Sequence, residues 1–235
     1  MKPFRISRQR GFTLLETVIA IGVLAVLLTG FMIVFTPAAE GIRKAINVQQ
    51  ADRMASTLEQ ELITLRTKDY PTGFDKSFEY IKSSNTAKDA LFVYQYRGGV
   101  SSLRADDNTP TPQPLLKEKL PGKDYVVVPM MRRKSDPKFA EDLTAVEGAV
   151  YLVKCTQLIF SGNQLSNGTA GTIKDPKLGA AVASADAYPE AVIAFAAEFY
   201  LTPAKTKEYF LSNAFSTRFP ILKNPVFTRN LAVRR

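Results

Sequence analysis

One carboxylate, Glu16, lies in an otherwise uncharged stretch of the chain. Residues 12–35 have the sequence FTLLETVIAIGVLAVLLTGFMIVF, and Glu16 is their only charged member. A carboxylate deep in an apolar membrane helix costs about 3 kcal/mol on insertion scales unless it has a partner. We therefore expect Glu16 to pair with a cation and so to act in the recognition of a partner group. The alternative is that Glu16 lies near the membrane interface and reaches water, because Arg10 precedes it closely in the chain.

Composition limits the other chemistries. The chain has no histidine and a single cysteine, Cys155. Histidine triads, histidine metal sites, intrachain disulfides and four-cysteine zinc sites are therefore excluded. The sequence shows no phosphate-binding glycine loop and no nucleophile elbow, and Asp106-Asp107-Asn108 lacks the ligand spacing of a calcium loop. We expect no enzyme activity, cofactor or metal. We expect Cys155 to be a small buried residue, with a reactive or intermolecular thiol as the alternative.

The element that must hold Glu16 is a membrane-spanning helix. As a helix, residues 12–35 span roughly 36 Å, which exceeds a bilayer core of about 30 Å. A soluble helix is seldom apolar on all sides over such a length. Four basic residues and no acid precede the segment: Lys2, Arg5, Arg8 and Arg10. These charges predict that the amino terminus stays in the cytoplasm and that the rest of the chain lies beyond the membrane.

The residues around Glu16 also carry a resemblance to a known family. The string RQRGFTLLE, followed by an unbroken apolar run, resembles the class III signal of type IV prepilins and type II secretion pseudopilins. The resemblance covers residues 5–36. It rests on a short basic leader, a glycine at its end, a phenylalanine next, and a glutamate at the fifth position after the glycine.

This resemblance implies processing followed by assembly. A prepilin peptidase in the membrane would cut between Gly11 and Phe12 on the cytoplasmic side and N-methylate the new amine, which stays cationic. Glu16 would pair with this amine, in its own chain or in a neighbour. Desolvation cancels much of such an attraction, so the pair is expected to set axial register more than stability. The residues implied to share the assembly contact are Thr13, Leu14, Leu15 and Glu16. The implied partners are other pilin-like subunits, the peptidase and the inner-membrane assembly platform.

Two other fates of the amino-terminal segment stay open. An ordinary secretory signal has an apolar region of about 7–15 residues and a small-residue cleavage site after it. The run here is longer, but Thr36-Pro37-Ala38 and Pro37-Ala38-Ala39 place small residues just beyond it. An uncleaved single-pass anchor would instead keep residues 1–11.

The sequence predicts four parts in the chain. These are a leader at 1–11, a transmembrane or filament-core helix at 12–36, an amphipathic helix at 37–66, and an extracytoplasmic head at 67–235. The amphipathic helix is indicated by apolar residues at helical spacing: Ile42, Ile46, Met54, Leu58, Leu62 and Leu65. Pro37 is expected to kink the junction or to end the first helix.

The head is predicted to be an α+β domain with an antiparallel sheet under the amphipathic helix. β-forming residues predict strands at 90–97, 123–130, 146–160 and 191–201, with a helix as the alternative for the last because of its alanines. Weaker strand candidates are 74–81 and 209–216. Loops are expected at 98–122, with a short helix at 115–120, and at 161–189. The tail from Phe219 is expected to form an edge strand, to contact a neighbour or to fray.

Basic residues outnumber acidic ones, 31 to 22, for a formal net charge of +9. Apart from the leader, the excess lies in the carboxy-terminal tail and in a cluster formed by Arg132, Arg133 and Lys134. Basic clusters can contact the phosphates of nucleic acid. The alternative is that these residues are solvated or paired with acidic neighbours.

These observations predict a structural function for a single-pass inner-membrane protein with a cytoplasmic amino terminus. The size of the head and the TLLE string favour a minor pseudopilin, or a tip subunit, over a major pilin. The resemblance implies that the filament would be a type IV pilus or a type II secretion pseudopilus, with the head on the periplasmic side before assembly. Two alternatives are a DNA-binding minor pilin for DNA uptake and a membrane-anchored envelope enzyme or binding protein.

Overall fold

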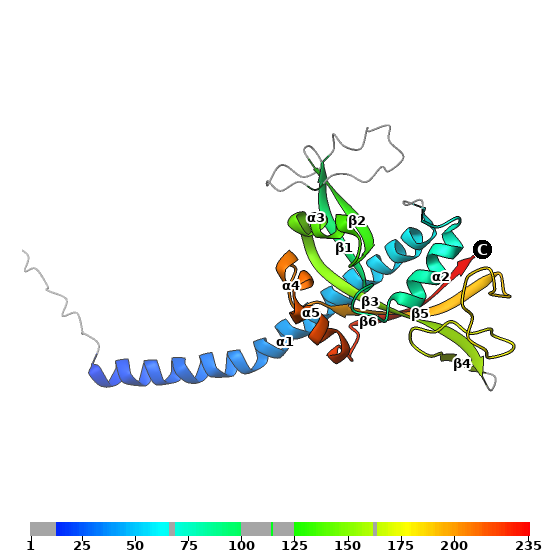
Figure 1. Ribbon diagram of the computed structural model, residues 1–235. Coiled ribbons are helices and arrows are strands. Elements are labelled where there is room, and N and C mark those ends of the chain that lie inside the picture. Colours follow the sequence, from blue (N-terminus) through cyan, green and yellow to red (C-terminus); the bar gives the residue numbers. More distant parts are fainter. Residues whose placement is uncertain (1–12, 66–68, 100–113, 115–124, 162–163) are drawn as a thin grey trace, which may run out of the picture. The chain divides into compact units, whose positions relative to one another are not determined.

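The computed structural model describes residues 13–65, 69–99, 114, 125–161 and 164–235 (Figure 1). Contacts divide the chain into two compact units, residues 1–45 and residues 46–235. The first contains the amino-terminal part of helix α1 (Leu14–Ile63). The second contains the end of α1 and all the other elements. The prediction of a long amino-terminal helix followed by an antiparallel sheet is confirmed.

Pro37 lies inside α1 and does not end the helix, which corrects one of the two outcomes expected for it. Proline removes one backbone donor and leaves the carbonyl four residues earlier without its usual partner. A hydroxyl supports the adjacent turn, because Thr36 Oγ1 donates to the Met32 carbonyl at 2.9 Å. Such side-chain bonds help a helix tolerate proline.

The second unit is built on one curled antiparallel sheet with the strand order β2-β1-β3-β5-β6. The strands are β1 (Leu91–Gly99), β2 (Tyr125–Arg133), β3 (Val146–Ser161), β5 (Val192–Leu201) and β6 (Phe227–Arg234). A short strand, β4 (Gln164–Asn167), pairs with the end of β3. The four stronger strand predictions are confirmed, with bounds that differ by up to three residues, and the strand alternative holds for 191–201.

One face of the sheet packs against helices α1 and α2 (Gly73–Ser83). The helices bring Met54, Leu58, Leu62 and Phe78 to this core. From the strands come alternate residues of each strand: Leu91, Val93, Tyr151, Val153, Ile193, Phe195, Ala197 and Phe199. The apolar stripe predicted for the amphipathic helix at residues 37–66 is only partly buried, because Ile42, Ile46 and Leu65 are exposed.

The other face of the sheet is also covered, and so the strands are buried on both sides. Phe92, Tyr94 and Leu152 point to this face, where they meet rings from four short helical segments. These segments are α3 (Pro137–Asp142), α4 (Lys207–Leu211), α5 (Asn213–Arg218) and the 3₁₀ turn η3 (Phe219–Ile221). Phe92 stacks on Phe139 with ring centroids 4.7 Å apart. Figure 1 shows α3, α4 and α5 on the side of the sheet away from α2.

The weaker strand predictions were wrong, because both segments are helical. Residues 74–81 belong to α2, where Thr72 and Asp75 form a capping box at the helix start. Residues 209–216 fall in α4 and α5, and Ser212 caps the second of these by accepting from the Ala214 backbone. A capping side chain satisfies backbone donors that have no partner within the helix. This local chemistry outweighs the β propensity of the aromatic residues in both segments.

The remaining predictions concern loops and the tail. The tail forms an edge strand, since β6 pairs with β5 from Phe227 to Arg234. The segment at 161–189 is mostly irregular but contains β4 and a single bridge between Lys174 and Ala181. Most of the loop at 98–122, including Asp106-Asp107-Asn108 and the short helix expected at 115–120, lies outside the described residues.

Candidate processing and assembly segment

The first unit presents apolar side chains on every side of its helix. The exposed ones include Leu14, Val18, Leu24, Phe31 and Phe35. Among the described residues, α1 is the one helix long and apolar enough to cross a membrane. Its most apolar 18-residue window has a mean hydropathy of 2.8, and none of that window is buried. Such a surface needs lipid or other apolar helices around it.

The hydroxyl groups in this segment are satisfied by the helix itself. Thr17 Oγ1 donates to the Thr13 carbonyl at 3.3 Å, and Thr29 Oγ1 donates to the Ala25 carbonyl at 2.8 Å. Thr36 makes the bond to Met32 described above. Because polar groups without partners are costly in hydrocarbon, this pairing lets the threonines lie in a bilayer or in a helix bundle.

The helix begins with a capping box formed by Thr13 and Glu16. The Thr13 backbone nitrogen and Oγ1 both donate to Glu16 Oε2 at 2.9 Å. In return, the Glu16 backbone nitrogen donates to Thr13 Oγ1 at 3.3 Å. Among the described residues, nothing donates to Glu16 Oε1. Glu16 therefore caps its own helix with one oxygen and keeps the other oxygen and a full negative charge for a further partner.

The structure describes some of the predicted site residues and leaves others outside. Gly11 and Phe12, the predicted cleavage and methylation residues, lie outside the described residues. Leu14 and Leu15 are 86% and 69% exposed, so their side chains are free to contact other helices. The bond between Glu16 and the Phe12 amine stays a prediction. The sequence analysis did not foresee the capping role of Glu16, although the T-x-x-E spacing at residues 13–16 is a signal for it.

The basic cluster at residues 132–134 serves the head's own packing. Arg132 is buried, with Nε 2.6 Å from Asp142 Oδ2 and Nη1 3.0 Å from Asp136 Oδ2. Tyr94 Oη donates to the same Asp142 oxygen at 2.7 Å. Burial raises the pKa of the Asp142 carboxyl, and the charge of Arg132 and the hydrogen bond from Tyr94 oppose that rise. Arg132 is therefore committed to an internal ion pair and is not placed to contact phosphate.

The other two members of the cluster lie against aromatic rings. The Arg133 guanidinium lies 3.9 Å from the ring centroid of Tyr80, and Lys134 Nζ lies 4.8 Å from that of Phe215. Burial raises the pKa of Tyr80 to about 12, which keeps its ring neutral beneath Arg133. Burial also lowers the pKa of Lys134. These contacts are cation–π interactions of the kind that stabilise a folded domain.

The described residues contain no group of acidic or cysteine side chains that could hold a metal ion. Cys155 is fully buried in the sheet, as expected. Its backbone nitrogen donates to Ser84 Oγ at 2.9 Å. Burial raises the pKa of the Cys155 thiol to about 12, which makes it a poor nucleophile near neutral pH.

Comparison with known families bears on the same amino-terminal segment. Residues 6–32 match the family model described as the prokaryotic N-terminal methylation motif. The chain therefore carries the prepilin-type signature, which spans the predicted processing site and most of the apolar helix. This confirms the resemblance inferred from RQRGFTLLE. No curated protein and no solved structure matches the chain.

Proposed function

We propose that the protein is a pilin-like subunit that assembles through helix α1 into a type IV pilus or a type II secretion pseudopilus. The observation that carries this proposal is the prepilin-type signature at residues 6–32, which runs directly into an exposed apolar helix. A prepilin peptidase cuts before Phe12 and methylates its amine. The processed helix leaves the membrane only to enter another apolar environment, the core of a filament.

Glu16 sets the axial position of helix α1 as it passes from the membrane into the filament. Its Oε1 and its charge stay available while Oε2 caps the helix. A methylated Phe12 amine, from the same chain or from a neighbour, is a cation of opposite charge at the same end of the segment. The gain in free energy is small after desolvation, but a wrong axial offset leaves a charge unpaired in an apolar bundle, which costs several times more. Glu16 thereby selects the register of assembly.

The size of the second unit supports a minor subunit or a tip subunit. Residues 46–235 form a sheet covered on both faces, which is a large head for a subunit that must repeat along a filament. We assign the protein to the inner membrane before assembly, with its amino terminus in the cytoplasm and its head on the periplasmic side. We assign it no enzymatic role, and the internal pairing of Arg132 argues against DNA uptake through residues 132–134.

Glu16→Gln in the native host tests the assembly step. Glutamine can still accept the capping bonds from Thr13, so the substitution removes the charge and retains the helix start. We expect normal cleavage and methylation but strong loss of the subunit from sheared filaments, quantified by mass spectrometry of a head peptide. The matched control is Glu40→Gln, an exposed acid farther along the same helix. Equal incorporation of both variants and the unmodified protein would overturn the proposed role of Glu16.

A further inference from the structure

A break in the pairing of β1 with β3 opens a small polar pocket in the second unit. Val93 pairs with Tyr151, but Gln95 pairs with Glu147, so three residues of β3 stand opposite Tyr94. Gly148, one of the three, has a φ of +70°, which favours glycine, and nothing lies within 4 Å of the position of a β-carbon there. The strands part at this bulge and leave a cavity of about 70 Å³.

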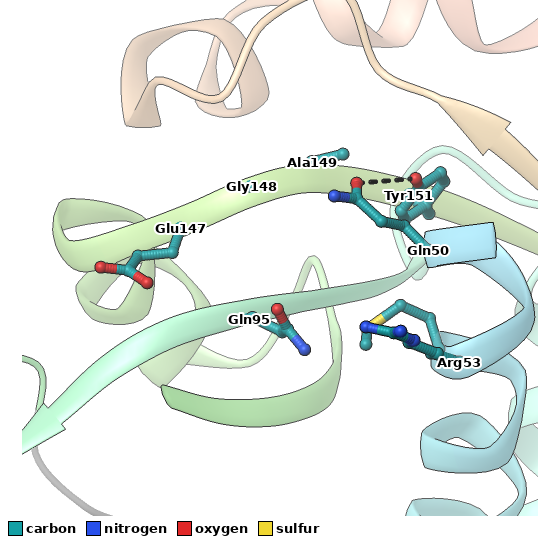
Figure 2. A pocket seen from close by; sticks show the side chains of 8 residues that line it. Gln50, Arg53, Gln95, Glu147, Gly148, Ala149 and Tyr151 are labelled. Atoms are coloured by element: carbon teal, nitrogen blue, oxygen red, sulfur yellow. Dashed lines mark hydrogen bonds between the residues drawn. The ribbon is translucent and has the colours of Figure 1, made fainter. Parts of the chain in front are cut away.

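Helix α1 and the two strands supply the lining. The residues are Gln50, Arg53 and Met54 of α1, Gln95 of β1, and Glu147, Gly148, Ala149 and Tyr151 of β3 (Figure 2). Tyr151 Oη donates to the Asn47 carbonyl at 3.0 Å and lies 3.4 Å from Gln50 Oε1. This second contact occupies the oxygen of Gln50 and leaves its amide nitrogen turned toward the pocket, as Figure 2 shows.

The charges of the pocket are separated. In Figure 2, Arg53 and the Gln95 amide face each other at one end, and the Glu147 carboxylate is turned away at the other. Glu147 has a cation of its own, with Arg97 Nε 3.9 Å away. Within the part of the chain that the structure describes, Arg53 and Gln95 make no side-chain hydrogen bond or ion pair. One end of the pocket therefore presents the exposed guanidinium of Arg53 opposite the Gln95 amide, and the Gln50 amide lies farther along the pocket beside Tyr151.

We propose that this end of the pocket binds a carboxylate group, held by Arg53 and by the amide nitrogens of Gln50 and Gln95. A guanidinium and amide N–H groups are donors that match the two oxygens of a carboxylate. The pocket has room for a group of the size of a carboxylate together with water, because one water needs only about 10–15 Å³ of such a volume. If the proposed function holds, the carboxylate is an acidic side chain or the chain end of a neighbouring pilin-like subunit.

The carboxylate chemistry can be tested without knowing the partner. Full-length protein with ¹⁵N-glutamine, in detergent micelles, is titrated with sodium acetate, and sodium chloride at equal ionic strength serves as the reference. We expect saturable shifts of two side-chain amides, assigned as Gln50 and Gln95 by substitution of each, with acetate only. Arg53→Met should weaken acetate binding roughly tenfold, as expected for a charge-assisted contact, and Glu147→Gln should strengthen it. Arg218→Met, on α5, is the matched control and should change nothing. Shifts that are equal with chloride, or that survive Arg53→Met unchanged, would overturn the proposal.

The source of the carboxylate is tested in native membranes. Arg53→Lys retains a cation and introduces an amine, which a water-soluble carbodiimide joins to any carboxylate in direct contact. We expect a peptide that contains position 53 linked to Asp, Glu or the carboxy terminus of another pilin-like chain. Links only to Glu147 or Asp52 of the same chain would overturn the pocket as a binding site. Amide formation with added ¹³C-acetate alone would overturn a subunit as the source. Assembly is measured separately through Glu16→Gln, so normal assembly without the position-53 link defeats this inference and leaves the proposed function standing.

Discussion

The backbone nitrogen and the hydroxyl of Thr13 donate to the same oxygen of Glu16, each at 2.9 Å. The Glu16 carboxylate, whose charge the proposed assembly requires, is thus also the hydrogen-bond acceptor in the capping box at the start of the helix. In an apolar environment, the first backbone N–H groups of a helix have no water to bond, so a capping acceptor is valuable there. Because one oxygen performs this task, the other remains free for a cation without unwinding the first turn.

Thr13→Val should loosen the start of helix α1. Valine has nearly the same shape but lacks the hydroxyl that links Thr13 with Glu16 in both directions. Loss of an N-cap typically costs about 1 kcal/mol, so we expect faster amide hydrogen exchange over the first helical turn of the full chain in micelles. The control is Thr29→Val, which removes a hydroxyl bonded only to the Ala25 carbonyl. Identical exchange of this turn in the two variants would show that the capping box does not hold it.

Arg132→Met should destabilise the head, because it leaves the buried Asp142 carboxylate without its cation. Removing one partner of a buried ion pair typically costs about 3–5 kcal/mol. Urea unfolding of the full-length protein in micelles, followed by near-ultraviolet circular dichroism, measures the loss. Adding Asp142→Asn should recover part of it, since the pair is then removed together. Arg218→Met is the exposed control. A variant as stable as the unmodified protein, but with reduced and salt-dependent DNA retention, would restore the nucleic-acid interpretation of residues 132–134.

Lys76→Met should destabilise the carboxy-terminal end of α1. Lys76 Nζ of α2 donates to the Thr64 carbonyl at 2.6 Å and also to the Glu61 carbonyl, and both carbonyls lie at or just beyond the end of α1. Leaving buried acceptors unpaired costs about 1–3 kcal/mol. Lys82→Met is the matched control, because Lys82 lies on α2 like Lys76 but its contact with the Ala183 carbonyl is exposed. Equal urea midpoints for the two variants would contradict this role of Lys76.

Cys155 gives a pH dependence with a defined sign. Burial raises the pKa of its thiol to about 12, above the usual value of 9.0. The thiol's contribution to stability is fully present below the unfolded-state pKa and is lost as the pH rises toward the folded-state pKa, by up to about 1.4 kcal/mol per pH unit. Between pH 9 and 11 the stability of the unmodified protein should therefore fall more steeply than that of Cys155→Ala.

Iodoacetamide gives a second measurement of the same burial. At pH 8 it should label Cys155 in urea but hardly at all in the folded protein, because the thiolate is the reactive form. Rapid labelling of the folded protein, or identical pH slopes for the unmodified protein and Cys155→Ala, would show that the thiol is not held in its protonated state.

Sequence patterns predicted the elements that rest on local chemistry. The apolar run of residues 14–35 predicted the first part of α1 because of its length and continuity. The β-forming residues of β1, β3 and β5 also gave the right elements, because burial on both faces of the sheet suits such runs. The errors at 74–81 and 209–216 came from weighing aromatic β propensity above the caps at Thr72 and Ser212. Those caps were visible in the sequence, and greater weight on them would have identified both helices.

Other features depend on contacts that a single sequence does not specify. The Arg132–Asp142 pair forms because α3 follows β2 in the chain and its last residue, Asp142, lies against Arg132 of that strand. The carboxylate pocket depends on a bulge that is defined only by the register of β1 on β3. Gly148 is compatible with such a bulge, but nothing in the sequence indicates which partner strand it faces.

The amino-terminal peptide of the protein from its native host membrane tests the central claim most directly. Its mass, measured after proteolysis, distinguishes the three fates of the leader. A peptide that begins with N-methylated Phe12 is the result that the prepilin-type signature at residues 6–32 predicts. A peptide that retains residues 1–11 in all of the protein, or one that begins near Ala39, would contradict processing as a pilin-like subunit and, with it, assembly through helix α1.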